Sequence, residues 1–137
     1  MTKRSKQICG VILLTMPSIQ YGGYFLLQLL SGQYPELQLT EFQQSMFRAG
    51  HAHAGVLVIL SLIVQWLADH ARLSSLWEWF SRMGFPVAAL LISGGFFAGA
   101  AGTGITEPSS GIVLLYAGVF LLAASFLILG IGLLRSR

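Results

Sequence analysis

Four long stretches without a charged residue leave few folds open to this chain of 137 residues. They are residues 7–35, 49–68, 83–106 and 108–134, and each holds the roughly 20 apolar residues that a membrane-spanning helix needs. Hydrophobic side chains make up 55% of the sequence and charged ones only 9%, too few to coat a water-soluble globule. The sequence therefore predicts an all-α integral membrane four-helix bundle. It forms a single transmembrane domain over residues 1–137, with spans at about 8–30, 46–67, 83–101 and 111–134.

The charges between these spans predict an orientation. Lysine and arginine accumulate on the cytoplasmic side of membrane proteins, which places both termini in the cytoplasm of a multi-pass cell-membrane protein. The cytoplasmic side then holds Lys3, Arg4, Lys6, Arg72, Arg82, Arg135 and Arg137. The external side holds Glu36, Glu41 and Glu107, with Arg48 as its single basic exception. The net charge of +3 is thus a topology signal, and no nucleic-acid partner is expected.

Two histidines lie in the second span, where ionisable side chains are functional candidates. His53 is roughly 9 Å beyond Phe47 along the helix, near the external side. Residues two apart on a helix diverge by about 200°, so His51 and His53 point to different faces and cannot chelate one metal from the same chain. Arg48, His51 and Gly55 share one side, and His53 points away from it. His70 lies about 25 Å from His53 and cannot share its site. The lone Cys9 excludes a multi-cysteine metal cluster.

Small residues surround these imidazoles and recur in the third span. Gly50 and Gly55 flank the histidines, and Gly95 and Gly99 form a small-xxx-small pair. Such surfaces admit either the flat face of a planar cofactor such as haem or a closely packed neighbouring helix. Neutral imidazole is a good axial ligand for haem iron, and Arg48 could hold a haem propionate. The alternative is that the histidines hydrogen-bond across a helix interface.

The segment Phe47-Arg48-Ala49-Gly50-His51-Ala52-His53-Ala54-Gly55 resembles the start of the second helix of styrene oxide isomerases, which are small four-helix membrane enzymes. Ala52-His53-Ala54-Gly55 is similar to that family's Ala-His-Ser-Gly stretch, and Gly95-Phe96-Phe97 to its Gly-Phe-Tyr. The resemblance implies haem b with His53 as the axial ligand and His51 as the second choice. It also implies a homo-oligomer, a trimer in that family, with haem between subunits.

The resemblance further implies a redox-neutral rearrangement in which ferric haem acts as a Lewis acid on an epoxide oxygen. Two polar positions differ in this chain. Phe97 stands where the family has tyrosine, and Ile59 stands where it has asparagine, six residues after the ligand. The substrate therefore does not transfer, beyond a small apolar molecule arriving from the membrane lipid. The catalytic residues stay unknown, with His51, Phe97 and Ile59 as candidate pocket positions.

Two other functions remain open from the sequence. The first is a haem-free transporter, channel or accessory subunit whose external polar site comprises Arg48, His51, Glu41 and Glu107. The second is a copper or zinc site shared between chains, with His51 or His53 from each subunit.

Overall fold

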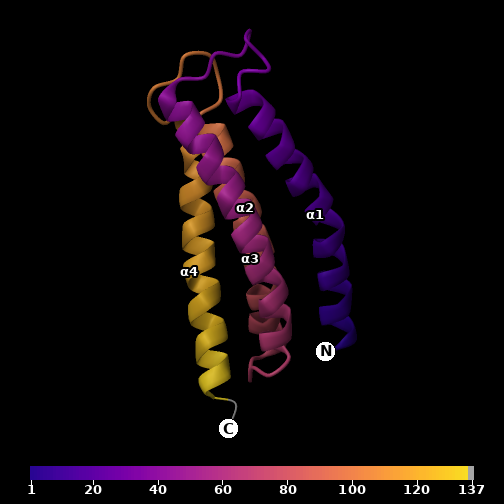
Figure 1. Ribbon diagram of the computed structural model, residues 1–137. Helices are drawn as coiled ribbons and strands as arrows, with labels where there is room; N and C mark the ends of the chain where they lie inside the picture. The colour runs from indigo at the N-terminus through magenta and orange to yellow at the C-terminus, as the bar shows by residue number, and fades with distance from the viewer. Residues whose placement is uncertain (136–137) are drawn as a thin grey trace.

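The computed structural model describes residues 1–135 and consists of four long helices joined by short loops. The helices are α1 (Lys3–Leu30), α2 (Glu41–Ala68), α3 (Ser75–Gly99) and α4 (Val113–Leu134), and a 3₁₀ turn, η1 (Ser110–Ile112), precedes α4. All four are long and apolar enough to cross a membrane, which confirms the predicted all-α fold of four membrane-length helices. Figure 1 shows the N-terminus and the C-terminal end of α4 at the same end of the bundle.

α1 and α2 begin before their predicted spans, and in each a threonine, Thr2 or Thr40, caps the first turn. Thr40 accepts a hydrogen bond from the Gln43 backbone N–H, and the Gln43 side chain accepts one from the Thr40 N–H. This reciprocal capping box satisfies two of the donors that a helix start leaves unpaired. The amide of Gln43 also donates to the carbonyls of Ala100 at 2.9 Å and Gly102 at 2.8 Å. Gln43 thereby fastens the start of α2 to the loop after α3.

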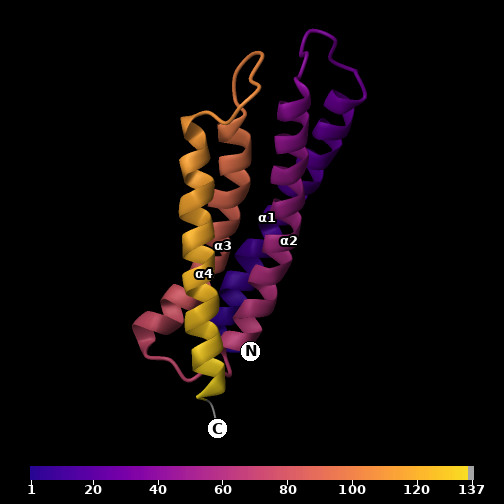
Figure 2. The same cartoon turned by 90° about the vertical axis from the view of Figure 1, so that its left-hand side faces the viewer.

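α3 is the central helix, and α1 is the peripheral one. In an apolar stretch of 18 residues within each helix, half of the residues of α3 are buried, against 6% of those of α1. α3 packs on α2 and on α4, whereas α1 packs mainly on α2. The buried apolar side chains form two clusters, one around Ala88 and Ile92 and the other around Val64 and Phe85. Figure 2 shows α1 and α2 leaning away from α3 and α4 toward the end opposite the termini.

Glycines allow α3 and α4 to approach closely. A Cβ atom on Gly95 would lie 2.2 Å from the Leu115 backbone nitrogen, and one on Gly118 would lie 2.7 Å from the Ile92 side chain. Contacts this short leave no room for a methyl group. The small-residue surface of α3 at Gly95 is therefore filled by α4.

Candidate functional site

The two histidines of α2 lie on opposite flanks of the helix, as their spacing predicts. His51 faces α1, where Gly23 leaves room for its imidazole: a Cβ atom on Gly23 would lie 2.7 Å from His51 Nε2. His53 lies on the other flank, with its ring centroid 4.9 Å from that of Phe96 on α3. The two imidazoles therefore belong to different environments, and they cannot serve one ion within a single chain.

His53 is held in an orientation that leaves one ring nitrogen free. Its Nδ1 lies 2.8 Å from the carbonyl oxygen of Ala49, one turn earlier in α2. Because a carbonyl can only accept a hydrogen bond, Nδ1 carries a proton, and in the neutral imidazole Nε2 is then the nitrogen with the lone pair. Metal-ligating histidines almost always donate their second N–H in this way, which fixes the tautomer and the ring orientation. His53 is exposed, so Nε2 is accessible from outside the bundle.

His51 lines a cavity of about 420 Å³ between α1, α2 and α3. Phe47 and Phe97 lie at the same cavity, with their ring centroids 5.5 Å apart. The remaining lining residues are apolar or small, apart from Ser18: Ile19, Gly22, Phe25, Leu26, Leu29 and Ala54. This space, called the His51 cavity below, brings together two of the three candidate pocket positions, His51 and Phe97.

Ile59, the third candidate, does not join them. Its side chain is 53% exposed, and it is not among the residues that line the His51 cavity. A pocket that includes Ile59 would have to be closed by a surface outside this chain.

The glycines predicted to border a cofactor divide into open and filled positions. A Cβ atom on Gly50 would lie 3.0 Å from the Phe97 ring, and one on Gly99 would lie 3.1 Å from Ile112. At Gly50, at Gly99 and at Gly95, which lies against Leu115, protein side chains or backbone already occupy the space beside the glycine. These three positions therefore agree with close packing of neighbouring helices, the alternative to a planar cofactor. Gly55 has nothing within 4 Å of an added Cβ atom and remains open.

Arg48 is exposed and has no ion-pair partner within the described residues. Its guanidinium donates to Gln44 Oε1 at 3.4 Å. Within residues 1–135 no ion pair joins Arg48 to Glu41 or Glu107, because all four ion pairs of this part of the chain lie at the end that holds the termini. Arg48 is thus available to an anionic group from a ligand or from another subunit.

No three histidine, cysteine, aspartate or glutamate side chains among residues 1–135 come close enough to hold a metal ion. A cofactor that itself supplies most of the metal ligands does not need such a cluster. Haem does this, since the porphyrin provides four nitrogens and the protein needs to add one axial ligand. The free Nε2 of His53 fits such a group, whereas Arg48, which lies on the His51 side of α2, would meet that haem only from another subunit.

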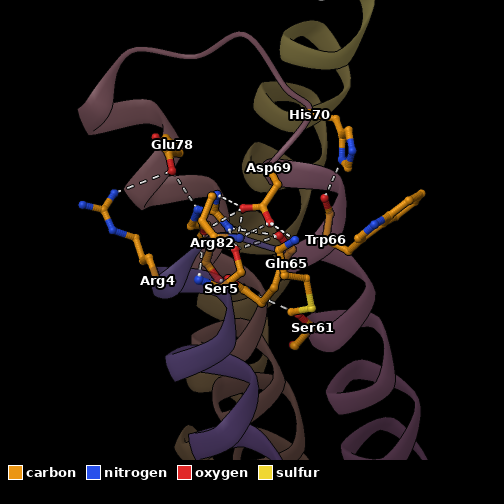
Figure 3. A network of polar contacts seen from close by, with 11 residues as sticks. Arg4, Ser5, Ser61, Gln65, Trp66, Asp69, His70, Glu78 and Arg82 are labelled. Carbon is orange, nitrogen blue, oxygen red and sulfur yellow. Dashed lines mark hydrogen bonds and ion pairs between the residues drawn. The ribbon is translucent and has the colours of Figure 1, made fainter.

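A second polar site, which sequence reasoning missed, lies at the end that holds the termini (Figure 3). Arg82 of α3 is only 1% exposed, and its charge, which predicted a position on the cytoplasmic side, gave no sign of this burial. Its guanidinium donates to Asp69 Oδ1 at 2.7 Å, Glu78 Oε1 at 2.9 Å and Ser5 Oγ at 2.8 Å. It also donates to the Gln65 carbonyl at 3.0 Å. We call these five residues the Arg82 cluster.

Pro86 accounts for one further bond of this cluster. A proline inside a helix has no N–H, so the carbonyl four residues earlier, that of Arg82, loses its helical partner. The Gln65 amide donates to that carbonyl at 2.9 Å and replaces the missing bond. The sequence signal was the Pro86–Arg82 spacing, together with Glu78 one turn before Arg82. The cluster joins α1, α2 and α3, which indicates a structural clamp.

Asp69 gives this clamp a pH dependence. Burial alone would raise the pKa of the Asp69 carboxyl, but hydrogen bonds from Ser5, Thr2 and Arg82 outweigh it and hold that pKa well below its usual range. His70 is next in sequence but exposed, with Nδ1 2.9 Å from the Trp66 carbonyl. It stays at the opposite end from His51 and His53, as predicted.

Comparison of the chain with protein-family models, with curated proteins and with solved structures finds no match, so its functional assignment depends on its own residues.

Proposed function

We propose that this protein is an integral membrane haem b-binding protein in which His53 is the axial ligand. The observation that carries the proposal is the His53 imidazole, whose Nδ1 is bonded to the Ala49 carbonyl while Nε2 is free on an accessible flank of α2. Donation of Nδ1–H to a carbonyl makes Nε2 a better donor to iron and keeps the ring from rotating. The resemblance of residues 47–55 to the styrene oxide isomerases supports the same ligand.

A second copy of the chain is needed to enclose the haem. His53 lies on the outer surface of the bundle, and the His51 cavity is on the other flank of α2. A haem on His53 would therefore be covered on one side by α2 and on the other by a neighbouring subunit. This arrangement agrees with the homo-oligomer, a trimer, that the resemblance implies.

Arg48 is the residue of this chain that we assign to the haem propionates. It has no ion-pair partner of its own among residues 1–135. Because Arg48 shares the His51 side of α2, it would serve a haem that is bound by His53 of another subunit. A guanidinium binds carboxylates through two parallel hydrogen bonds, which suits a propionate.

Haem with one open coordination position supplies a Lewis acid, so the enzymatic form of this proposal is a redox-neutral rearrangement of a small apolar substrate, as in epoxide isomerisation. The chain's own contribution is to exclude water and to hold that substrate. Phe97 and Ile59 present hydrocarbon where the resembled family has polar groups, so they can shape the substrate's position but cannot donate a hydrogen bond to it.

The orientation belongs to the same proposal. Lys3, Arg4 and Lys6 lie at the same end as Arg72 and Arg135, and Arg137 lies outside the described residues. The opposite end carries Glu36, Glu41 and Glu107. The positive-inside rule then puts both termini in the cytoplasm and His53 toward the external side of the cell membrane.

The proposal is tested by titrating haemin into the purified protein in detergent and following the Soret band. Wild type and the matched control His70→Ala should bind about one haem per chain, and His53→Ala should lose most of this binding. If His51→Ala loses binding and His53→Ala does not, the ligand is His51. A protein that never gains a Soret band contradicts the proposal. The haem-free transporter, channel or accessory subunit would then be the preferred function. Metal analysis on the same samples tests the copper or zinc alternative.

A further inference from the structure

The end of the bundle that holds the termini carries more positive charge than its acidic side chains neutralise. Both of its acidic residues within residues 1–135, Asp69 and Glu78, pair with the buried Arg82. Arg4 shares Glu78 through a longer contact of 3.6 Å. Four more cations at this end are exposed and have no ion pair within the described residues: Lys3, Lys6, Arg72 and Arg135. We call these four residues the basic patch.

The backbone brings two of these cations to one corner of the bundle. The Arg72 N–H donates to the Gly132 carbonyl of α4 at 2.9 Å, and Leu73 packs against Gly132. Arg135 ends α4 three residues after Gly132, so both arginines lie at the end of this helix. No acidic residue occurs in residues 70–77 or 108–135. Two like charges at one corner repel each other, and an anion from outside the chain would relieve that repulsion.

All three tryptophans of the chain lie at the same end. Trp66, in the last turn of α2, is 54% exposed, and Trp77 and Trp79, in the first turns of α3, are each 49% exposed. Figure 3 shows the Trp66 indole pointing away from the Arg82 cluster. Exposed indoles at the ends of membrane-spanning helices lie at the level of the lipid headgroups. The basic patch therefore lies at the depth of the headgroups as well.

The opposite end of the bundle lacks this excess of positive charge. It carries Arg48 as its single cation within residues 1–135, together with Glu36, Glu41 and Glu107. The complementary partner of the basic patch is thus an anion that is present at one membrane surface and is held at the depth of the indoles.

We propose that the basic patch binds the headgroups of anionic phospholipids, with a phosphate group at the corner formed by Arg72 and Arg135. Clusters of roughly four to eight lysines and arginines beside a membrane-spanning helix attract anionic lipids. A guanidinium also forms two parallel hydrogen bonds with a phosphate group. This surface is separate from His53 and depends neither on haem nor on the orientation of the chain in the membrane.

The experiment measures which lipid contacts the tryptophans. The full chain is placed in nanodiscs of phosphatidylcholine, and this lipid is replaced stepwise by phosphatidylglycerol or phosphatidylcholine with brominated acyl chains. Bromine quenches tryptophan fluorescence on contact, and all three tryptophans report on the end that holds the basic patch. Both lipids carry a phosphate, but only phosphatidylglycerol has a net negative charge. Half-maximal quenching of wild type should need about fivefold less brominated phosphatidylglycerol, the effect of roughly one cation beside each headgroup.

Salt and two variants test the cause of this preference. At about 1 M salt the screening length is only about 3 Å, so the two quenching curves should converge. Replacing all four residues of the basic patch by glutamine should also make the curves coincide. These side chains are exposed and unpaired, so the variant should keep the fold. The matched control Arg48→Gln removes the exposed cation of the opposite end and should keep the preference.

Equal quenching of wild type by the two lipids would overturn the proposal and leave these cations as a topology signal alone. A preference that persists in the fourfold glutamine variant or at high salt would overturn it as well, and so would its loss in Arg48→Gln.

Discussion

Replacing Asp69 by asparagine removes one charge from the Arg82 cluster while preserving the shape of the side chain. Asp69 and Arg82 are 7% and 1% exposed at their side chains and are joined at 2.7 Å. Removing one partner of a buried pair typically costs about 3–5 kcal/mol, because the other charge stays buried. Arg82 keeps Glu78 at 2.9 Å, so we expect the lower end of that range, about 3 kcal/mol of unfolding free energy.

The matched control is Arg4→Gln at the edge of the same cluster. Arg4 contacts Glu78 at 3.6 Å, but its side chain is 51% exposed, and an exposed pair contributes about 0.5 kcal/mol after solvent screening. Both variants would be unfolded in mixed micelles by increasing the fraction of sodium dodecyl sulfate, with tryptophan fluorescence as the signal. If the two variants lose the same free energy within about 0.5 kcal/mol, the buried pair is no stronger than a surface pair and the clamp interpretation fails.

Three further predictions use the same unfolding assay. The folded pKa of Asp69 is lowered, so the stabilisation from its carboxylate is present above the ordinary aspartate pKa of about 4 and is lost as the pH falls below it. The difference in unfolding free energy between wild type and Asp69→Asn should therefore narrow between about pH 5 and pH 2.5. A difference that stays constant over this range would contradict the prediction. Gly95→Ala should cost about 1–3 kcal/mol by forcing α3 away from α4, while Gly94→Ala, which meets no neighbour, should be neutral or slightly stabilising; similar losses in both would refute the close packing. Gln43→Ala should cost about 2 kcal/mol, because it removes the Gln43 side-chain half of the capping box and both bonds to the loop after α3, while the exposed Gln38→Ala should have no effect.

The parts of the structure that were predicted from sequence depend on local rules. Uncharged stretches of about 20 residues set the four helices, and the Thr40–Gln43 spacing is typical of the capping box that starts α2. The opposite flanks of His51 and His53 follow from the turn of 100° per residue, which needs no knowledge of the neighbouring helices.

The parts that were missed depend on contacts between helices. The burial of Arg82 requires Ser5 from α1 and Gln65 from α2 at the same point in space, and the spacings of Glu78, Arg82 and Pro86 within α3 do not identify these two partners. The small residues at Gly95 were compatible with a planar ligand or a helix, and only the position of α4 distinguishes the two.

The most direct test of the central assignment is chemical rescue of the proposed iron ligand. His53→Gly, purified in detergent with one equivalent of haemin, should show no Soret band of a histidine-bound haem, and millimolar imidazole should restore that band by occupying the vacated position. His51→Gly should keep the band without imidazole. Restoration by imidazole in His53→Gly alone is the result we predict. A wild-type protein without the band, or a His53→Gly protein that retains it, would contradict the assignment of His53 as the ligand.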